Sequence, residues 1–504
     1  MVTCLATDSG RALGWACVVG LLLAVLGPPP VQSVTLPPET DLSAVPPSDP
    51  RKMRFAPVEF APPEPERIVL ENGMVVYLLE DHELPLVTIT ASIQTGSWLD
   101  PPDKVGLAEL AGETMRSGGT RFMSAAEVDE ELEHLAASVA VGIGVESGFA
   151  MLDVLKKDLD RGLKIFSEVL IAPAFDGERV ELAKLQEIES IRRRQDRPQS
   201  IAGREFAKLL YGPTHPFGRN TSIESVSRIT RDDLIAFHQK TVHPNGVILG
   251  VTGDFDTRMM LSKLRKAFGG WKKGAIPEIV IPPITVSRLS GVTGGQLNDV
   301  HFVGKETSQV HLRIGHLSLK ENDPDFPALS LLNDILGGSS FRSRLFQDVR
   351  TKGGLAYSVG SLLLAGTRER GVWLMRASTK VQSTDEAITR LLANMKRLRE
   401  QPVTDTELEE AKEAFVNSFV FSFTSSSRIV SRLIGLEYDD LPKDFLQQLR
   451  DKVMKLTKED LLKAAQKHLH PDRLEILAVG PPQEVVPRLS RFGEVKEIKL
   501  DSRG

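Results

Sequence analysis

The chain has 504 residues, too many for one ordinary hydrophobic core, so we expect at least two domains. Charged residues make up 26% and apolar residues 41% of it, as in a globular protein rather than a disordered or fibrous one. The formal net charge is -5, and no basic stripe carries interleaved aromatic residues, so nothing points to a nucleic-acid partner.

Residues 1–33 have the features of an export signal. Trp15 to Leu26 is an unbroken run of apolar or small residues, and the sequence VQS at 31–33 suits cleavage. We expect cleavage there and export, with a periplasmic location; an uncleaved membrane anchor is the alternative. Both cysteines, Cys4 and Cys17, lie in this segment, so the mature chain would have no disulfide, thiol nucleophile or thiolate metal site.

A proline-rich stretch over 34–65 predicts an extended arm or linker. A first domain is expected over 66–274. Its opening pattern predicts a hairpin around the Glu-Asn-Gly turn at 71–73. The further elements expected are a strand over 86–95, helices over 106–116 and 124–136, paired strands within 139–154, helices over 156–170, 177–195 and 198–211, and a buried strand over 246–253.

A second linker is expected over 275–292 and a second domain over 293–504, with the same plan. The elements expected are strands near 300–318, helices within 324–352, strands within 355–378, and helices over 384–400, 405–420, 424–436 and 443–470. The plan is repeated in individual residues, each pair 227 positions apart (230 and 457, for example). Thr230, Leu234, Gln239, Lys240, His243, Pro244 and Gly253 correspond to Thr457, Leu461, Gln466, Lys467, His470, Pro471 and Gly480. A constant offset over seven identities indicates an internal duplication.

The most informative stretch runs from 336 to 361, LGGSSFRSRLFQDVRTKGGLAYSVGS. The spacing of its apolar residues Phe341, Leu345, Phe346 and Val349 predicts one face of a helix. Lys-Gly-Gly at 352–354 predicts the end of that helix, and 355–364 is typical of a strand. Arg350 would then end the helix and Tyr357 begin the strand, so a tight turn could bring the two polar side chains together.

This stretch resembles the second-half signature of the insulinase/pitrilysin zinc metallopeptidases, which include the mitochondrial processing peptidase subunits. The glycine loop, SRLFQ-x-VR and GLAYSV all coincide, although family members often have Arg where this chain has Gly353. In that family an Arg, and a Tyr seven positions later, hold the substrate peptide and its oxyanion, which implies these roles for Arg350 and Tyr357. The resemblance also implies a substrate loop, formed by Gly337, Gly338, Ser339 and Ser340.

The same resemblance, which covers about 66 to 485, implies the fold. We expect an α+β protein with two homologous domains, each a mainly antiparallel sheet covered by helices. Together the two domains would form one half of a clamshell.

The zinc motif of the family is missing. Active members carry H-x-x-E-H on a first-domain helix, where the two histidines ligate zinc and the glutamate is the general base. The corresponding helix here, with one inserted residue allowed, has Glu109, Gly112 and Glu113 at those positions. The downstream glutamate ligand is replaced by Ser190, or by Glu187 or Glu189 in a shifted register.

Glu109 and Glu113 could in principle hold a hard cation such as Mg²⁺ or Ca²⁺. A solvated pair of carboxylates, or a pair that faces a substrate chamber, is the simpler interpretation. We therefore expect no metal in this chain.

The resemblance thus implies a non-catalytic, substrate-binding subunit of a heterodimeric zinc-dependent endopeptidase acting on peptides or unfolded proteins. This chain would hold no cofactor, and zinc would belong to a homologous partner with an intact H-x-x-E-H. One alternative is a peptide-binding or structural scaffold protein without proteolysis. Another is a self-sufficient metalloendopeptidase with an unrecognised metal site.

Overall fold

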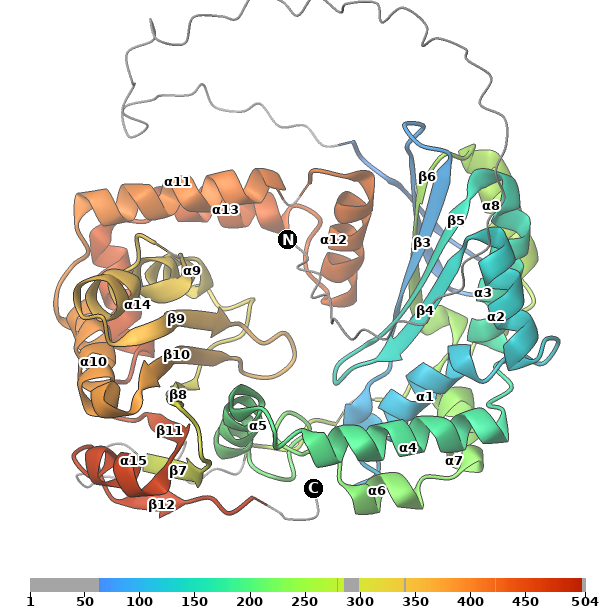
Figure 1. Cartoon of the computed structure of the whole chain (residues 1–504). Coiled ribbons are helices and arrows are strands. Elements are labelled where there is room, and N and C mark those ends of the chain that lie inside the picture. Colours follow the sequence, from blue (N-terminus) through green and yellow to red (C-terminus); the bar gives the residue numbers. More distant parts are fainter. Residues whose placement is uncertain (1–62, 279, 285–298, 340, 422, 501–504) are drawn as a thin grey trace, which may run out of the picture. The chain divides into compact units, whose positions relative to one another are not determined.

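The computed structural model describes residues 63–278, 280–284, 299–339, 341–421 and 423–500 (Figure 1). The predicted export signal, most of the proline-rich arm and half of the second linker lie outside these residues. Among the helices of the described ranges, none combines the length and the apolar character that crossing a membrane requires.

The first half of the described chain contains a six-stranded sheet in the order β1-β2-β6-β3-β5-β4 (Figure 1). Its strands are β1 Glu66–Val69, β2 Val75–Glu80, β3 Leu86–Ile93, β4 Ser138–Ile143, β5 Gly148–Leu155 and β6 Val247–Gly253. Neighbours pair antiparallel except β2 and β6, which run parallel. Val87, Ile89, Ala91 and Ile93 alternate along β3 and are buried in one core cluster, so one face of this sheet faces the core.

Eight α-helices accompany this sheet in the described part of the first half. They are α1 Leu107–Ser117, α2 Ala125–Leu135, α3 Leu159–Ile171, α4 Gly177–Arg193, α5 Pro198–Tyr211, α6 Ile223–Arg228, α7 Arg231–Thr241 and α8 Thr257–Phe268; short 3₁₀ turns are η3 Ser97–Leu99, η4 Lys156–Asp158 and η5 Pro244–Gly246. The start of α1 is fixed by the Asp100 carboxylate, which accepts hydrogen bonds from the backbone N–H groups of Gly106 and Ala108, both at 2.9 Å. Gly106 has φ of 104°, a conformation that favours glycine.

The second half contains another six-stranded sheet, in the order β12-β7-β11-β8-β10-β9. Its strands are β7 Asp299–Gly304, β8 Gln309–Leu317, β9 Ala356–Leu364, β10 Val372–Lys380, β11 Glu475–Gly480 and β12 Val495–Glu497. The pairs β12–β7 and β7–β11 are parallel and the other neighbours antiparallel. The α+β prediction with two similar domains is confirmed, and both sheets are mixed.

The helices of the second half are α9 Phe326–Asn333, α10 Thr384–Glu400, α11 Asp405–Phe421, α12 Ser426–Tyr438, α13 Phe445–Lys455, α14 Lys458–His468 and α15 Pro482–Leu489, with the π-helical turns η6 Asp334–Gly338 and η7 Phe346–Lys352 and the 3₁₀ turn η8 Val381–Ser383. The helical run predicted over 443–470 is two helices. The first ends at Lys455, with Leu456 in an extended conformation, and Thr457 caps the second. Thr457 forms a reciprocal capping box with Asp460, and its repeat equivalent Thr230 does so with Asp233. The repeated threonine therefore has a structural reason.

The helical run predicted up to 352 is also interrupted. Gly337 and Gly338 lie in η6, where a Cβ on Gly337 would come within 2.4 Å of the Ser361 backbone nitrogen, so a glycine is needed for η6 to approach β9. Ser339 then ends the turn, since its hydroxyl donates to the Asp334 carbonyl at 2.8 Å. The prediction that Phe341 shares a helical face with Leu345 and Val349 is wrong: its side chain is 69% exposed and it lies before the helical turn, whereas Leu345 and Val349 are fully buried.

Helices α5 and α12 are repeat equivalents, and each packs on the sheet of the other half. Helix α5 contacts β11 and β8, and helix α12 contacts β6, β2 and β3. Tyr211, the last residue of α5, donates its hydroxyl to the carbonyl of Arg370 at 2.8 Å. Tyr438, the last residue of α12 and 227 positions later, donates to the carbonyl of Glu146 at 2.7 Å. The two halves are therefore interlocked by a reciprocal exchange.

Candidate functional site

The structure brings the predicted pair Arg350 and Tyr357 together. The guanidinium carbon of Arg350, in η7, lies 5.8 Å from the centre of the Tyr357 ring and 4.7 Å from that of Phe346. Gly354, with φ of 61°, makes the turn between η7 and β9. Both side chains of the pair are exposed, Tyr357 by 75%. The predicted tight turn therefore presents an arginine and a tyrosine side by side to solvent.

Tyr357 owes its exposure to a β-bulge that the sequence did not indicate. On β9 and β10, Ser358 pairs with Ser378 but Ala356 pairs with Thr379, which leaves Tyr357 as an extra residue. Ala356 is buried in the core under the sheet. Because β9 is the edge strand of this sheet, the bulge aims Tyr357 outward where a ligand can reach it.

The turn that carries Arg350 is fixed by contacts with helices α10 and α11. The carbonyl of Asp348 accepts from Arg390 at 3.0 Å, and its carboxylate accepts from Arg390 at 3.1 Å and from Asn394 at 2.7 Å. Arg344 forms a two-pronged ion pair with Glu407, at 2.7 and 2.8 Å. These positioning residues were missed by sequence reasoning, since their partners lie on α10 and α11. Such contacts pre-organise a binding group, and π-helical turns are frequent at functional sites.

The residues predicted to replace the zinc motif lie on α1. Glu109 and Glu113 are exposed and one helical turn apart, whereas Gly112 is fully enclosed. A Cβ on Gly112 would lie 2.6 Å from the backbone nitrogen of Ile143 and 2.9 Å from the carbonyl carbon of Gly142, both on β4. The position predicted to correspond to the catalytic glutamate of active relatives therefore has no room for a side chain.

Three carboxylates interact at this place. Although Glu109 and Glu113 reach solvent, the protein around them and around Glu187 displaces enough water to raise the pKa of all three carboxyls. The charge of Glu109 raises the pKa of the other two further. Of the three α4 candidates, Glu187 is the one whose pKa is raised by the charges of Glu109 and Glu113. Ser190 is exposed one helical turn later, and Glu189 is ion-paired to Arg192. The mutual repulsion of the three carboxylates costs stability at neutral pH.

The three glutamates do not fit zinc. They offer neither histidine nor cysteine, and they are not among the described groups whose ligand atoms converge closely enough for an ion. Two other clusters have that convergence: Asp299, His301 and Glu475, and Asp323, Asp325 and His468. In each a lysine already neutralises an aspartate, Lys496 with Asp299 at 2.9 Å and Lys467 with Asp325 at 2.5 Å.

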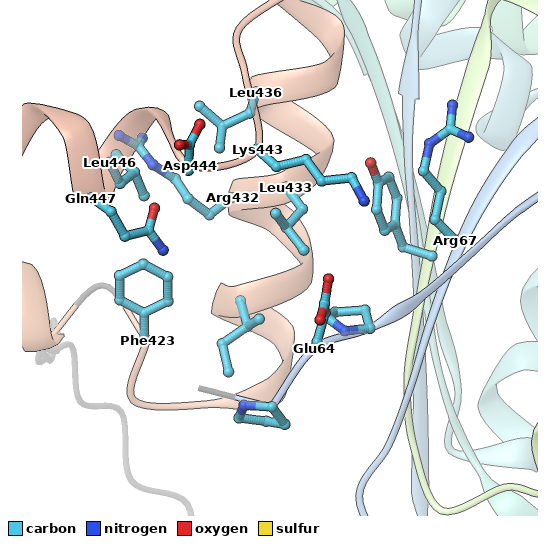
Figure 2. Close-up of a pocket in the computed structure, with 14 residues that line it drawn as sticks. Glu64, Arg67, Phe423, Arg432, Leu433, Leu436, Lys443, Asp444, Leu446 and Gln447 are labelled. Carbon is cyan, nitrogen blue, oxygen red and sulfur yellow. The ribbon is translucent and has the colours of Figure 1, made fainter. Parts of the chain in front are cut away.

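A pocket of different character lies beside the first strand. Figure 2 shows its labelled side chains, which come from α12, from α13, from β1 and from the residues just before each of these elements. Its apolar residues are Phe423, Ile429, Leu433, Leu436 and Leu446. Arg67 and Tyr77 on its wall both bind the Glu437 carboxylate of α12, with the Nε of Arg67 at 2.8 Å. The lining includes neither Arg350 nor Tyr357, so this pocket is separate from the Arg-Tyr pair. It lies where α12 packs against the first sheet.

Comparison with known proteins agrees with the fold and with the family that the sequence resembles. The family model of insulinase (peptidase family M16) matches residues 75–211, and the model described as peptidase M16 inactive domain matches residues 228–415. The chain is 27% identical over 373 residues to the uncharacterized zinc protease YmxG of Bacillus subtilis (strain 168), a match that covers 73% of this chain and 86% of that protein.

Two further comparisons concern relatives described as lacking activity. The chain is 24% identical over 389 residues to the non-peptidase homolog YmxG of Helicobacter pylori (strain ATCC 700392 / 26695), covering 76% of this chain and 86% of the relative. The crystal structure of a peptidase M16 inactive domain from Pseudomonas fluorescens superposes with a TM-score of 0.73 at 25% identity, covering 83% of this chain and 98% of that one.

These matches, together with the two sheets and the Arg-Tyr turn, define the class. The chain belongs to the insulinase (M16) peptidase family. The assignment of Glu109, Gly112 and Glu113 to the zinc-motif positions of this family stays a prediction from the sequence.

Proposed function

We propose that this chain is the non-catalytic, substrate-binding subunit of a heterodimeric zinc-dependent endopeptidase that acts on peptides or unfolded proteins. One observation carries the proposal: Arg350 at the end of η7 and Tyr357 on the bulge of edge strand β9 are presented together, while position 112 has no room for a catalytic glutamate. The chain keeps groups that can bind a peptide and lacks the groups that activate water. For peptide cleavage, that combination requires a second chain that has them.

The polar groups of the exposed pair have no polar side-chain partner among the described residues. Within the described ranges, Arg350 forms no ion pair with a carboxylate, and the hydroxyl of Tyr357 forms no hydrogen bond. The nearby arginines Arg344 and Arg390, in contrast, do have carboxylate partners. A guanidinium and a phenol that are held in place but left unused are suited to an external ligand.

In this proposal the partner is a homologous subunit with an intact H-x-x-E-H, and this chain holds no cofactor. The zinc of the partner supplies the activated water. Arg350 binds a carbonyl oxygen of the peptide through its fixed N–H groups. Tyr357 donates its hydroxyl proton to the oxygen that becomes negatively charged when the scissile carbonyl is attacked, which stabilises the transition state more than the ground state.

The apolar run that ends before residue 33 supports export of the chain, and we propose a periplasmic location for the complex. Compartment and partner can be tested together, by isolating the protein from the cell envelope.

A second function uses the same surface without chemistry. A peptide-binding or scaffold protein would need Arg350 and Tyr357 to hold an extended peptide at the edge of the sheet, and would need no partner with zinc. The closed position 112 is compatible with this role, and so is the name non-peptidase homolog that one relative carries.

Co-expression with a family member that has an intact zinc motif, encoded in the same genome, separates the two functions. The subunit proposal expects a stable 1:1 complex whose peptidase activity is lost with a chelator and regained with zinc. Each chain alone should be inactive. Repeated recovery of this chain only as a homodimer or monomer, with no activity in any mixture, would support the scaffold function instead.

A further inference from the structure

Two arginines face each other on the second sheet. Arg313 of β8 and Arg376 of β10 are directly opposite in the antiparallel register. Their neighbours along the strands, Leu312, Ile314, Met375 and Ala377, are buried in the core cluster under the sheet. The two arginines therefore point to the other face of the sheet, where Arg376 is exposed and Arg313 half-buried.

This arrangement is unfavourable without a ligand. Like charges directly opposite on antiparallel strands destabilise a sheet. Burial lowers the pKa of Arg313, and the charge of Arg376 lowers it further. Over the described ranges neither guanidinium forms an ion pair with a carboxylate; one N–H of Arg313 donates to the backbone carbonyl of Leu312 at 3.1 Å. Unfavourable features of this kind are retained mainly where they serve a function.

The arginine pair lies on the same face of the sheet as Ser358, the neighbour of Tyr357 at the bulge. Ser378 of β10 pairs with Ser358 next to the bulge, and Arg376 lies two residues before Ser378, toward the middle of the strand. Two residues of a strand span about 7 Å, and adjacent strands are about 5 Å apart. An extended peptide that contacts Tyr357 would therefore reach Arg376 about two to three residues away.

We infer that Arg313 and Arg376 form a subsite for a carboxylate of the bound peptide. This carboxylate lies two to three residues from the scissile peptide bond, whose carbonyl oxygen accepts from Tyr357. The inference deepens the proposed function and rests on it for the position of the peptide. Two guanidinium groups present parallel N–H donors that match the oxygens of a carboxylate, and such charge-assisted bonds are about twice as strong as neutral ones. The carboxylate can be an Asp or Glu side chain or the C-terminus of the peptide.

Binding to the isolated chain tests the subsite without requiring proteolysis. The probes are fluorescein-labelled twelve-residue peptides in which one glutamate is moved through an otherwise uncharged sequence, with matched glutamine versions. Anisotropy should show roughly tenfold tighter binding when glutamate occupies the favoured position. Each peptide is also made with a C-terminal acid and a C-terminal amide, which separates side-chain from C-terminal carboxylates; dependence on either supports the subsite.

Arg313→Gln and Arg376→Gln should each abolish the preference for glutamate and leave binding of the glutamine peptide unchanged. Both variants should also unfold at a higher temperature than the wild type, because the repulsion is removed. Arg228→Gln is the matched control, because this arginine already has a carboxylate partner, Glu224. Its substitution should leave the preference for glutamate unchanged and should not raise the unfolding temperature.

Equal affinity of the wild type for glutamate and glutamine peptides, or no binding of any peptide, would overturn the subsite. So would a preference that persists in both variants. A preference that behaves as expected, combined with no cleavage in any reconstituted complex, would uphold the subsite and contradict only the proposed proteolysis.

Discussion

Gly112 of α1 faces Ile143 of β4 so closely that a Cβ on the glycine would lie 2.6 Å from the backbone nitrogen of the isoleucine. Alanine is normally better than glycine inside a helix, by about 1 kcal/mol. Here the added methyl group would push α1 away from the sheet. We expect Gly112→Ala to lower the free energy of unfolding by about 1–3 kcal/mol, measured by urea denaturation.

Gly203, inside α5, is the matched control, because nothing lies within 4 Å of the place where its Cβ would be. Gly203→Ala should raise the free energy of unfolding by about 0.4–1 kcal/mol. Opposite signs for the two variants are expected. If both substitutions stabilise the protein, α1 is not packed against β4 as described, and position 112 could admit a glutamate.

The second prediction concerns metal. Purified from cells in zinc-containing medium, the chain alone should hold no stoichiometric zinc, and its thermal unfolding should not change on addition of EDTA. The reason is the ligand set, three glutamates that repel one another and no histidine or cysteine. One tightly bound zinc per chain by elemental analysis would contradict this prediction and support a self-sufficient metallopeptidase.

The sequence predicted most elements, because their signals are local. The hairpin β1–β2 follows from its Asn-Gly turn, and α2 begins after Ser124, whose capping partner Glu127 lies three residues later. The packing partners of those elements were not predictable. Helices α5 and α12 have ordinary amphipathic patterns, and such a pattern does not specify which sheet it covers.

Only the part of the candidate site that lies within the stretch 336–361 could be predicted from the sequence. The spacing of Arg350 and Tyr357 and the turn between them sufficed to bring the two side chains together. The bulge at Tyr357 depends on the register between β9 and β10, which no local pattern of β9 records. The closed position at Gly112 likewise depends on a strand about 30 residues further along the chain.

The third prediction concerns pH. Burial raises the pKa of Asp334, in the π-helical turn before Ser339, to about 6. The folded state therefore holds this proton at pH values where the unfolded state has lost it, so stability falls as pH rises from about 4 to about 6. Asp334→Asn removes the charge and should raise the free energy of unfolding by about 1–3 kcal/mol at pH 7.5. Denaturation at pH 4 should show little difference, and a gain of equal size at both pH values would contradict this assignment.

The fourth prediction separates structural from functional tyrosines. The hydroxyl of Tyr211 donates across the two halves to Arg370, so Tyr211→Phe should lower the free energy of unfolding by about 1 kcal/mol. Tyr357→Phe should leave the unfolding midpoint unchanged, since its ring packing remains. Tyr77 is unsuitable as a neutral control, because its hydroxyl binds Glu437. Loss of stability in the Tyr357 variant alone would indicate that this tyrosine is structural.

Arg350 provides a further contrast. In the reconstituted complex, Arg350→Ala should raise KM as well as lower kcat, because contacts with a carbonyl oxygen act in the ground state and the transition state alike. Arg350→Lys keeps the charge but not the planar fork of donors, and should recover only part of the loss. Full activity of the alanine variant would remove Arg350 from the binding site.

The most direct measurement is the steady-state kinetics of the reconstituted complex with Tyr357→Phe, in which the zinc-bearing partner is unchanged. If the Tyr357 hydroxyl donates to the developing oxyanion, kcat should fall on the order of 10²-fold, with KM, zinc content and complex formation preserved. Tyr211→Phe, assayed below its unfolding temperature, should retain the wild-type kcat. A wild-type kcat for Tyr357→Phe would contradict the claim that this chain supplies a group to the active site of its partner.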